Sequence, residues 1–430
     1  MSRAEESTPL DMAASEAREI HELAVRAPKT KRIRPWERYL EAELGIRNHW
    51  YPAFFGAELA EADVSNAHGS PIANVRIETL LGERILFRRV GGRILAVADR
   101  CLHRGVSLAK RPECYTKDSI TCWYHGFTYA MDTGKLTAVL TEPGSSLIGQ
   151  VGLLSYPVEE RAGLVWVFIG DIDAPPLELD VQPGLLDDDL AVYPHGWSKV
   201  VECNWRTAAE NGFDPAHAYI HRNSAFVTDY KIPMVLGDAG MSRQHGMRIV
   251  DAPGAPVGVV LERGGGTAVW EAEVSPGVNV GARFRPGEPG VLDGMNPEVS
   301  IWMPCGLWVD PMPAPGIVHV EWYVPIDKNH HRYLITWAKS VGSEAERDAF
   351  FRETAQHWAD YVPTKFTNDD VFARTAMHEF YDEGNGWQEE RLFGPDVVIT
   401  NWRKLVSRQA RGIQTADKAW ARHRPEPRGE

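Results

Sequence analysis

Two short motifs in the sequence each combine one cysteine with one histidine. The first is Cys101-Leu-His103 and the second is Cys122-Trp-Tyr-His125. Each spacing allows one tight turn to present two ligands to a metal centre. Zinc sites with two cysteines and two histidines usually keep like ligands together, so the mixed pairs favour a different centre. They suit a two-iron, two-sulfur cluster in which one iron takes both thiolates and the other takes both imidazoles.

The residues beside the two pairs support this interpretation. Gly105 and Ser107 follow the first pair and Gly126 follows the second, which favours tight turns whose backbone N–H groups can face the cluster sulfurs. One iron with two thiolates and one with two imidazoles is the Rieske [2Fe-2S] arrangement. We therefore predict that Cys101, His103, Cys122 and His125 hold a Rieske cluster. Structural zinc is the alternative.

A second group of candidate ligands lies between Glu210 and His221. Asp214 followed by Pro215 is typical of a helix start, so His217 and His221 are expected on one helix face, four residues apart. Two histidines and a distant carboxylate form the facial triad that binds iron(II) and leaves room for O₂ and substrate. A chance pair of histidines and a zinc hydrolase are the alternatives, but the His-Glu-x-x-His motif of such hydrolases is missing from the sequence.

The two predicted centres support one another. A one-electron Rieske carrier needs a nearby consumer of electrons, and a mononuclear iron that activates O₂ is such a consumer. The missing carboxylate is best sought in Asn368-Asp369-Asp370. Spacing does not choose between the two acids, and a solvated acidic helix start is the alternative for this pair.

Composition bounds the class of protein. The 430 residues are enough for two or three domains, and the net charge of −13 argues against nucleic-acid and anionic membrane surfaces. Apolar runs such as Gly163–Ile169 have strand length and are too short to span a membrane. A polar, acidic start argues against a secretory signal, so we expect a cytoplasmic protein. Reduced thiols are therefore expected at Cys114, Cys203 and Cys305.

The pattern along the chain predicts three parts. Residues 1–40 form a polar extension with a helical candidate, Ala13–Arg26, and a basic segment, Lys29–Arg34. An all-β domain is expected over residues 41–170, and the proline-rich segment Asp171–Pro176 marks its boundary. The third part, residues 171–430, mixes strands and helices.

Local patterns predict individual elements. In the second part, Val75–Leu80, Arg84–Val90 and Ile94–Val97 alternate as strands, with a glycine hairpin turn before the last. In the third, a capping box at Ser343 begins a helix that runs to Tyr361. Further strands are expected at Val259–Leu261, Ala268–Ala272, Val299–Met303, Val318–Val324 and Tyr333–Trp337.

Together these residues resemble the large subunit of the Rieske non-haem iron ring-hydroxylating oxygenases, and within that family the carbazole-type, homotrimeric terminal oxygenases. The resemblance runs from Gly45 to Thr415. It rests on the motifs Asn48-His-Trp-Tyr-Pro52, Asp99-Arg-Cys-Leu-His-Arg-Gly-Val106, Thr121-Cys-Trp-Tyr-His125, Asn204-Trp-Arg206, Glu210-Asn-Gly-Phe-Asp-Pro215, Glu321-Trp-Tyr-Val-Pro325, Asn368-Asp-Asp370 and Trp402-Arg-Lys-Leu405.

The resemblance implies an α+β fold, with an all-β Rieske domain before a helix-grip-like catalytic domain that has a central antiparallel sheet and flanking helices. It implies that His217, His221 and Asp370 bind the mononuclear iron(II). Asp214 is implied to bridge an iron histidine to a cluster histidine, His125, of the neighbouring subunit, which makes the homotrimer necessary for electron transfer.

The implied activity is hydroxylation of an aromatic or N-heteroaromatic, carbazole-like substrate with O₂. The electrons are implied to come from NAD(P)H through a reductase and a ferredoxin. Monooxygenation or demethylation of an N-heterocycle is the alternative, because pocket geometry selects among these reactions. A pure electron carrier would have lost the second set of ligands, and that set is complete. The resemblance places the substrate pocket at Gly212, Ala218, Leu307, Val309, Met312, Phe366 and Thr367.

Overall fold

The computed structural model describes residues 35–62, 74–232, 246–261, 273–275, 278–279, 284, 287–292, 295 and 297–421. Most of the predicted N-terminal extension, including Ala13–Arg26 and Lys29–Arg34, lies outside the described residues, as does the predicted strand Ala268–Ala272. None of the described helices is long and apolar enough to cross a membrane.

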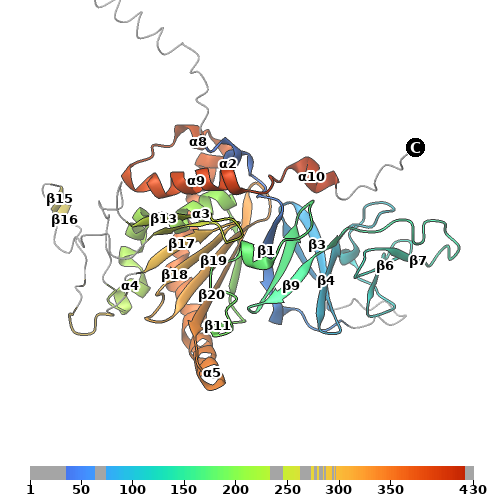
Figure 1. The fold of residues 1–430 in the computed structure, drawn as a ribbon, viewed down its shortest axis with the longest axis horizontal. Helices are drawn as coiled ribbons and strands as arrows, with labels where there is room; N and C mark the ends of the chain where they lie inside the picture. Colours follow the sequence, from blue (N-terminus) through green and yellow to red (C-terminus); the bar gives the residue numbers. More distant parts are fainter. Residues whose placement is uncertain are drawn as a thin grey trace, which may run out of the picture.

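The N-terminal part of the chain is built from three small antiparallel sheets, at the right of Figure 1. Their orders are β1-β10-β9, β2-β3-β4-β8 and β5-β6-β7. The predicted hairpin is confirmed, because β3 pairs with β4 around two glycines with positive φ. The strands are β1 (His49–Phe55), β2 (Arg76–Leu80), β3 (Glu83–Val90), β4 (Arg93–Ala98), β5 (Ser119–Thr121), β6 (Phe127–Ala130), β7 (Leu136–Val139), β8 (Ser155–Tyr156), β9 (Val158–Arg161) and β10 (Leu164–Ile169).

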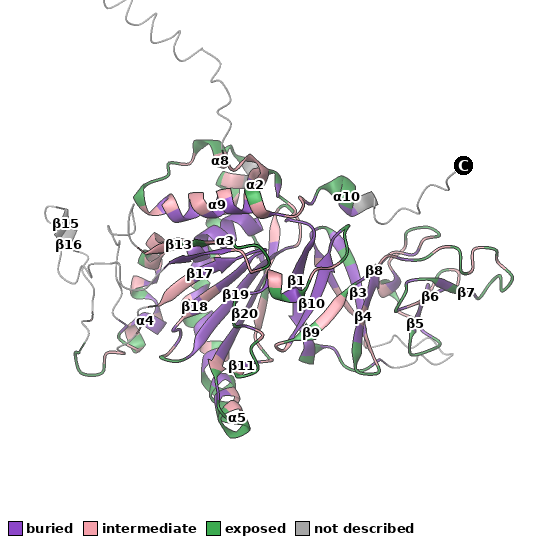
Figure 2. Cartoon of the chain, viewed as in Figure 1, coloured by how far each residue is buried: buried purple, intermediate pink, exposed green. Residues whose placement is uncertain are grey.

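An eight-stranded antiparallel sheet forms the centre of the C-terminal part. Its order is β11-β20-β19-β18-β17-β14-β13, and β12 also pairs with β20. Strand β19 is buried along its whole length and β20 over Tyr333–Ala338, where helices cover the sheet (Figure 2). The strands are β11 (Leu190–Val192), β12 (Trp197–Glu202), β13 (Met247–Val250), β14 (Gly258–Leu261), β17 (Glu298–Trp302), β18 (Gly306–Asp310), β19 (Val318–Pro325) and β20 (His330–Ser340), beside a separate pair, β15 (Glu273–Ser275) and β16 (Val278–Asn279).

One group of helices lies in the chain between β12 and β13 of this sheet, and a longer helical run follows β20. The predicted helix start is confirmed, because Ser343 Oγ accepts the N–H of Glu346 at 3.3 Å. The capping box is only half formed, since the side chain of Glu346 accepts the N–H of Gly342 at 2.7 Å and not that of Ser343. The helical run continues through three π-helical segments. The helices are α2 (Glu37–Glu41), α3 (Trp205–Phe213), η4 (Pro215–Asn223), α4 (Ala225–Asp229), α5 (Glu344–Glu353), η6 (Thr354–Trp358), α6 (Ala359–Val362), η7 (Pro363–Thr367), α7 (Asn368–His378), η8 (Glu379–Glu383), α8 (Gly386–Glu389), α9 (Val397–Gln409) and α10 (Ala416–Ala421). Short 3-10 helices are η1 (Gly56–Glu58), η2 (Leu108–Lys110), η3 (Leu177–Asp180) and η9 (Gly394–Asp396).

A single hydrophobic core joins β1 and β10 to the large sheet. The indole rings of Trp166 on β10 and Trp322 on β19 meet edge to face, with their centroids 5.7 Å apart. A second, smaller core lies under β5, β6 and β7 and includes the two cysteines of the predicted cluster. The fold is therefore the predicted α+β arrangement, an all-β part followed by an antiparallel sheet with helices. The domain limits at residues 40 and 170 stay a prediction.

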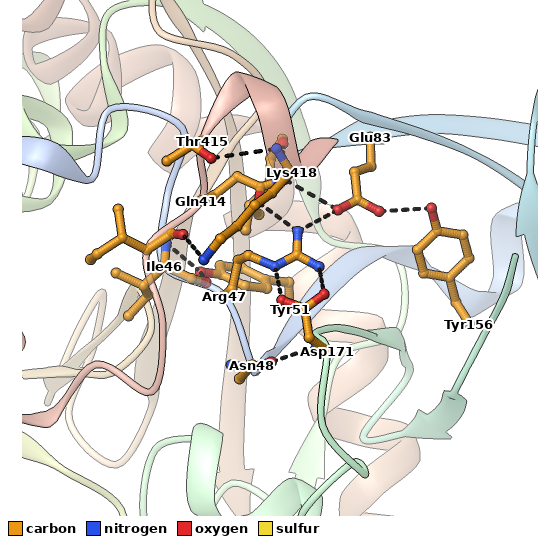
Figure 3. A network of polar contacts seen from close by, with 12 residues as sticks. Ile46, Arg47, Asn48, Tyr51, Glu83, Tyr156, Asp171, Gln414, Thr415 and Lys418 are labelled. Carbon is orange, nitrogen blue, oxygen red and sulfur yellow. Dashed lines mark hydrogen bonds and ion pairs between the residues drawn. The ribbon is translucent and has the colours of Figure 1, made fainter. Parts of the chain in front are cut away.

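A polar network around Arg47 also ties the two parts together (Figure 3). The buried guanidinium group of Arg47 donates to Glu83 on β3 at 2.7 Å, to Asp171 after β10 at 2.9 Å and to Gln414 near the C-terminus at 2.5 Å. Because a buried charge is costly unless it is paired, this cation fixes three distant segments around one point.

Candidate metal centres

The two cysteine–histidine motifs form turns of the same design. The carbonyl oxygen of each cysteine accepts the N–H of the glycine four residues later, Gly105 for Cys101 and Gly126 for Cys122, both at 2.9 Å. Both glycines have a φ of 70°, in the left-handed region that favours glycine. The sequence therefore builds two equivalent loops, and each presents a thiol and an imidazole.

The four predicted cluster ligands meet as two like pairs. The buried thiols of Cys101 and Cys122 are within hydrogen-bond distance of each other. The Nδ1 atoms of His103 and His125 lie 3.0 Å apart. His103 is exposed and His125 is half-buried, so the thiols form the inner end of the site and the imidazoles form the outer end. This donor set fits a [2Fe-2S] cluster with one thiolate-bound and one imidazole-bound iron.

Tyr129 supports the inner end of this site. Its hydroxyl oxygen lies 3.2 Å from Sγ of Cys101 and also accepts the N–H of Leu102 at 3.2 Å. Hydrogen bonds from Cys122 and Tyr129 lower the pKa of the Cys101 thiol, which favours the thiolate that a metal needs. The sequence offered no local signal for this contact, because β6 brings Tyr129 to the loop from outside both motifs.

The second group of predicted ligands also converges. Nε2 of His217 lies 3.6 Å from Oδ1 of Asp370, and Nε2 of His221 lies 3.4 Å from Oδ2 of the same carboxylate. Each residue offers one ligand atom within 4.8 Å of the other two. Two imidazoles and one carboxylate on one side of a point are the donor set of a facial triad.

The polar atoms of this triad fit a bound cation. Within the described part of the chain, the ring nitrogens of His221 and Oδ1 of Asp370 are buried and make no hydrogen bond. Buried polar atoms normally have a partner, and these face one another at distances that leave room for an ion. Burial alone would raise the pKa of Asp370, but His221, Arg374 and His217 hold it well below its usual range. The carboxylate is therefore ionised, as a metal ligand must be.

The predicted α-helix over the two histidines was wrong in its type. Asp214 caps the segment through its Oδ1, which accepts the N–H of Ala216 at 2.7 Å, but the segment η4 is a 3-10 helix. In such a helix residues four apart are offset by about a third of a turn. The rings of His217 and His221 cross at 85°, with their centroids 5.4 Å apart.

Asp214 also orients an imidazole of the triad. Its backbone carbonyl accepts a hydrogen bond from Nδ1 of His217, which leaves Nε2 of that ring directed at Asp370. A hydrogen bond to one ring nitrogen fixes the tautomer that offers the other nitrogen to a metal.

Burial distinguishes Asp369 from Asp370, the two adjacent acids between which the sequence spacing does not choose. The side chain of Asp370 is 6% exposed and faces both histidines, whereas that of Asp369 is 42% exposed and approaches only Nδ1 of His221, at 3.5 Å. Burial and contacts therefore favour Asp370 as the third ligand.

A buried polar group beside the triad was missed by the sequence analysis. Glu321 on β19 accepts hydrogen bonds from His319 and Tyr323, and Arg374 on α7 lies over the rings of Tyr323 and Tyr333. Alternation along β19 is the sequence signal that puts His319, Glu321 and Tyr323 on one face. Strand pairing brings Tyr333 to them and helix packing brings Arg374, and neither leaves a local signal in the sequence.

One of the predicted pocket residues contacts the triad, and the pocket as a whole stays a prediction. The ring of Phe366 stacks on that of His221 at a centroid distance of 3.8 Å, and Thr367 is buried beside it in η7. A Cβ atom at Gly212 would overlap the hydroxyl group of Tyr323, so glycine is required there. The other predicted members are half-buried Ala218 on η4, Leu307 and Val309 on β18, and buried Met312 shortly after β18.

Comparison with known proteins agrees with both sites. Residues 50–150 match the Rieske [2Fe-2S] domain, and residues 168–414 match the homotrimeric ring hydroxylases. The chain belongs to the homotrimeric ring hydroxylase family. This ring hydroxylase is therefore a Rieske oxygenase, an oxidoreductase with the two predicted kinds of iron centre.

Carbazole 1,9a-dioxygenases are among the most similar proteins. The ring hydroxylase is 42% identical to the terminal oxygenase component from Sphingomonas sp, over 90% of this chain and 97% of the relative. The solved terminal oxygenase from Novosphingobium sp. KA1 superimposes with a TM-score of 0.80 at 42% identity, covering 89% and 97% of the two chains. The structure of the reduced complex between oxygenase and ferredoxin in carbazole 1,9a-dioxygenase superimposes with a TM-score of 0.81 at 40% identity. The match covers 91% of this chain and 96% of that chain.

Proposed function

We propose that this ring hydroxylase is the terminal oxygenase of a multicomponent dioxygenase that hydroxylates a carbazole-like aromatic substrate with O₂. The observation that carries the proposal is the convergence of His217, His221 and Asp370, with the donor atoms of His221 and Asp370 buried and without a hydrogen bond, in a chain that also has the paired cysteines and histidines of a Rieske site. The likeness to carbazole 1,9a-dioxygenases supports the substrate class.

The assignment of ligands follows from the contacts. Cys101, His103, Cys122 and His125 would hold the [2Fe-2S] cluster, and His217, His221 and Asp370 would hold the mononuclear iron. When bound, the mononuclear iron supplies O₂ activation and the cluster supplies single electrons. The protein residues orient the ligands, surround the substrate and keep the site apolar.

Asp214 is proposed to connect subunits of the trimer. It lies half-buried beside His217, and burial raises the pKa of its carboxyl group. The imidazole end of the cluster site is at the surface, where a neighbouring subunit can reach it. A hydrogen bond from Asp214 to His125 of the neighbouring copy would place the two centres of adjacent subunits on one short path.

Electrons are proposed to come from NAD(P)H through a reductase and a ferredoxin. One solved relative was captured as a complex of oxygenase and ferredoxin, which supports a ferredoxin as the direct donor. A cytoplasmic location is also proposed, and fractionation of the native host would test it.

Turnover under isotopic oxygen tests the proposal. Purified protein, NADH, a ferredoxin with its reductase, and carbazole are incubated under ¹⁸O₂, and the products are analysed by mass spectrometry. Two labelled oxygen atoms in one product are expected. One labelled atom would establish the monooxygenase alternative, and unlabelled or unchanged carbazole in the presence of a reducible cluster would overturn the proposed substrate class.

A further inference from the structure

A buried carboxylate holds the segment that leaves the first cluster loop. Asp99, directly after β4, is 2% exposed. Its Oδ2 accepts the hydroxyl hydrogen of Ser107 at 2.7 Å, and its Oδ1 accepts the N–H of Ala109 at 2.8 Å. Arg84 on β3 forms an ion pair with the same carboxylate, which balances its charge. Because hydrogen bonds to a charged group are stronger than neutral ones, Asp99 fixes the segment from Ser107 to Ala109.

A side chain of the second cluster loop is hydrogen-bonded to this fixed segment. Trp123 lies between Cys122 and His125, and its indole Nε1 donates to the carbonyl oxygen of Ser107 at 2.9 Å. Ser107 therefore contacts Asp99 through its hydroxyl group and Trp123 through its carbonyl group. This pair of contacts connects the two loops outside the ligands themselves.

The position of Trp123 matters because a predicted imidazole ligand lies two residues later. The indole ring stacks on the ring of Tyr124, with their centroids 5.7 Å apart and their planes at 25°. The ring of Tyr124 in turn lies over that of His125, with a centroid distance of 3.8 Å. A fixed indole therefore also restrains the ring that covers His125. The orientation of a ligand ring is one of the properties by which a protein tunes a metal centre.

We propose that Asp99 and Trp123 are positioning residues of the cluster site, which set the orientation of His125 relative to His103 through their shared contacts with Ser107. This inference rests on the proposed assignment of the cluster ligands and adds to it two residues that are not ligands. Loops that are held together present the ligands in one geometry, whereas loops that move independently present a distribution of geometries.

Two measurements on the holoenzyme test the proposal. The rate of cluster loss is measured without O₂, as the acid-labile sulfide that stays on the reduced protein in the presence of an iron(II) chelator. The EPR linewidths of the reduced cluster report the spread of ligand geometries, which a structural role elsewhere in the fold would not change. The variant Trp123→Phe keeps an aromatic ring and loses the N–H donor. We expect it to lose the cluster about fivefold faster and to broaden the EPR lines.

A double-mutant cycle tests whether the two residues act together. Asp99→Asn should also lose the cluster at least about fivefold faster, because the charge-assisted acceptor is gone. If both residues act through Ser107, the double variant should lose the cluster at most about twice as fast as the faster single variant. Independent effects would instead multiply to about 25-fold or more, which would contradict the proposal.

Two further variants keep the test decisive. Trp123→His retains a ring N–H at the place of the indole N–H, so it should keep most of the slow cluster loss and the narrow EPR lines, even where the phenylalanine variant folds poorly. Trp166→Phe loses an indole hydrogen bond of 3.1 Å to the carbonyl of Arg161 in the separate sheet β1-β10-β9, and it should leave both measurements unchanged.

The outcomes separate this inference from the proposed function. Wild-type cluster loss and linewidths in a folded Trp123→Phe protein, or a Trp123→His protein as impaired as the phenylalanine variant, would overturn the positioning role. Either result would leave the oxygenase function intact if labelled product still forms. A wild-type protein without a reducible cluster would instead overturn the proposed ligand assignment.

Discussion

Nε of Arg374 donates a hydrogen bond to Oδ1 of Asn211 at 2.6 Å, and both residues are buried. Arg374 lies one helical turn after Asp370 on α7, and Asn211 lies near the end of α3, just before the 3-10 helix η4 that carries His217. This contact therefore joins the element that holds the carboxylate of the triad to the element that leads into its histidines.

Replacing Arg374 should weaken iron binding at the triad. The variant Arg374→Met loses both the link to Asn211 and the positive charge beside Asp370, and loss of such supporting contacts typically lowers metal affinity by about 10–100-fold. Competition with an iron(II) chelator measures the affinity. Arg352→Met, an exposed arginine on α5, is the matched control. A folded Arg374→Met protein with wild-type iron affinity would contradict the positioning role.

The adjacent acids should behave differently when each loses its charge. Asp370→Asn is expected to abolish iron retention and product formation, because Asp370 is buried between the two histidines. Asp369→Asn, half-exposed and next in the chain, should keep both properties within about threefold of wild type, since exposed charges contribute little. Iron content and turnover are measured on the same preparations, and the reverse pattern would show that Asp369 is the ligand.

Removing the hydroxyl group of Tyr129 should lower the reduction potential of the cluster. The hydrogen bond to Sγ of Cys101 stabilises the extra negative charge of the reduced state, and a bond of about 1 kcal/mol corresponds to roughly 40 mV for one electron. Redox titration of Tyr129→Phe, followed by the visible absorbance of the cluster, tests this. Tyr115→Phe, about half exposed, should leave the potential unchanged. A potential equal to or above that of wild type in Tyr129→Phe would refute the contact.

A methyl group at position 212 should disturb the triad. In Gly212→Ala the new carbon would overlap the hydroxyl group of Tyr323 and force α3 away from β19. We expect at least a tenfold loss of kcat/KM, because small displacements of reacting groups are costly. Gly144→Ala has no atom within 4 Å of its new carbon and should retain full activity. Wild-type kinetics in Gly212→Ala would show that the contact tolerates a side chain.

The residues that could be predicted from sequence are those whose chemistry is local. Cys101 and His103 sit in one turn, and His217 and His221 sit in one helical segment, so spacing alone pointed to metal ligands. Asp370 needed the family resemblance, since nothing in Asn368-Asp369-Asp370 reveals which acid faces inward. The hairpin at β3–β4 and the start of α5 at Ser343 could also be predicted, because turn and cap preferences act over a few residues.

Longer-range features could not be predicted. The approach of Arg374 to Asn211, and to Glu321 on β19, depends on how helix α7 packs, which has no signature in a single sequence. The 3-10 geometry of η4 was likewise missed, because a histidine spacing of four is read most simply as an α-helical face.

Iron and acid-labile sulfide counts on anaerobically purified protein test the assignment of the two centres most directly. With both centres present, the wild type should contain about three irons and about two sulfides per chain, and its visible bands should bleach on reduction. His221→Ala should retain about two irons and two sulfides, whereas Cys101→Ser should lose the sulfide and keep about one iron. A wild-type protein that contains only zinc, or a His221→Ala protein with unchanged iron, would contradict the account.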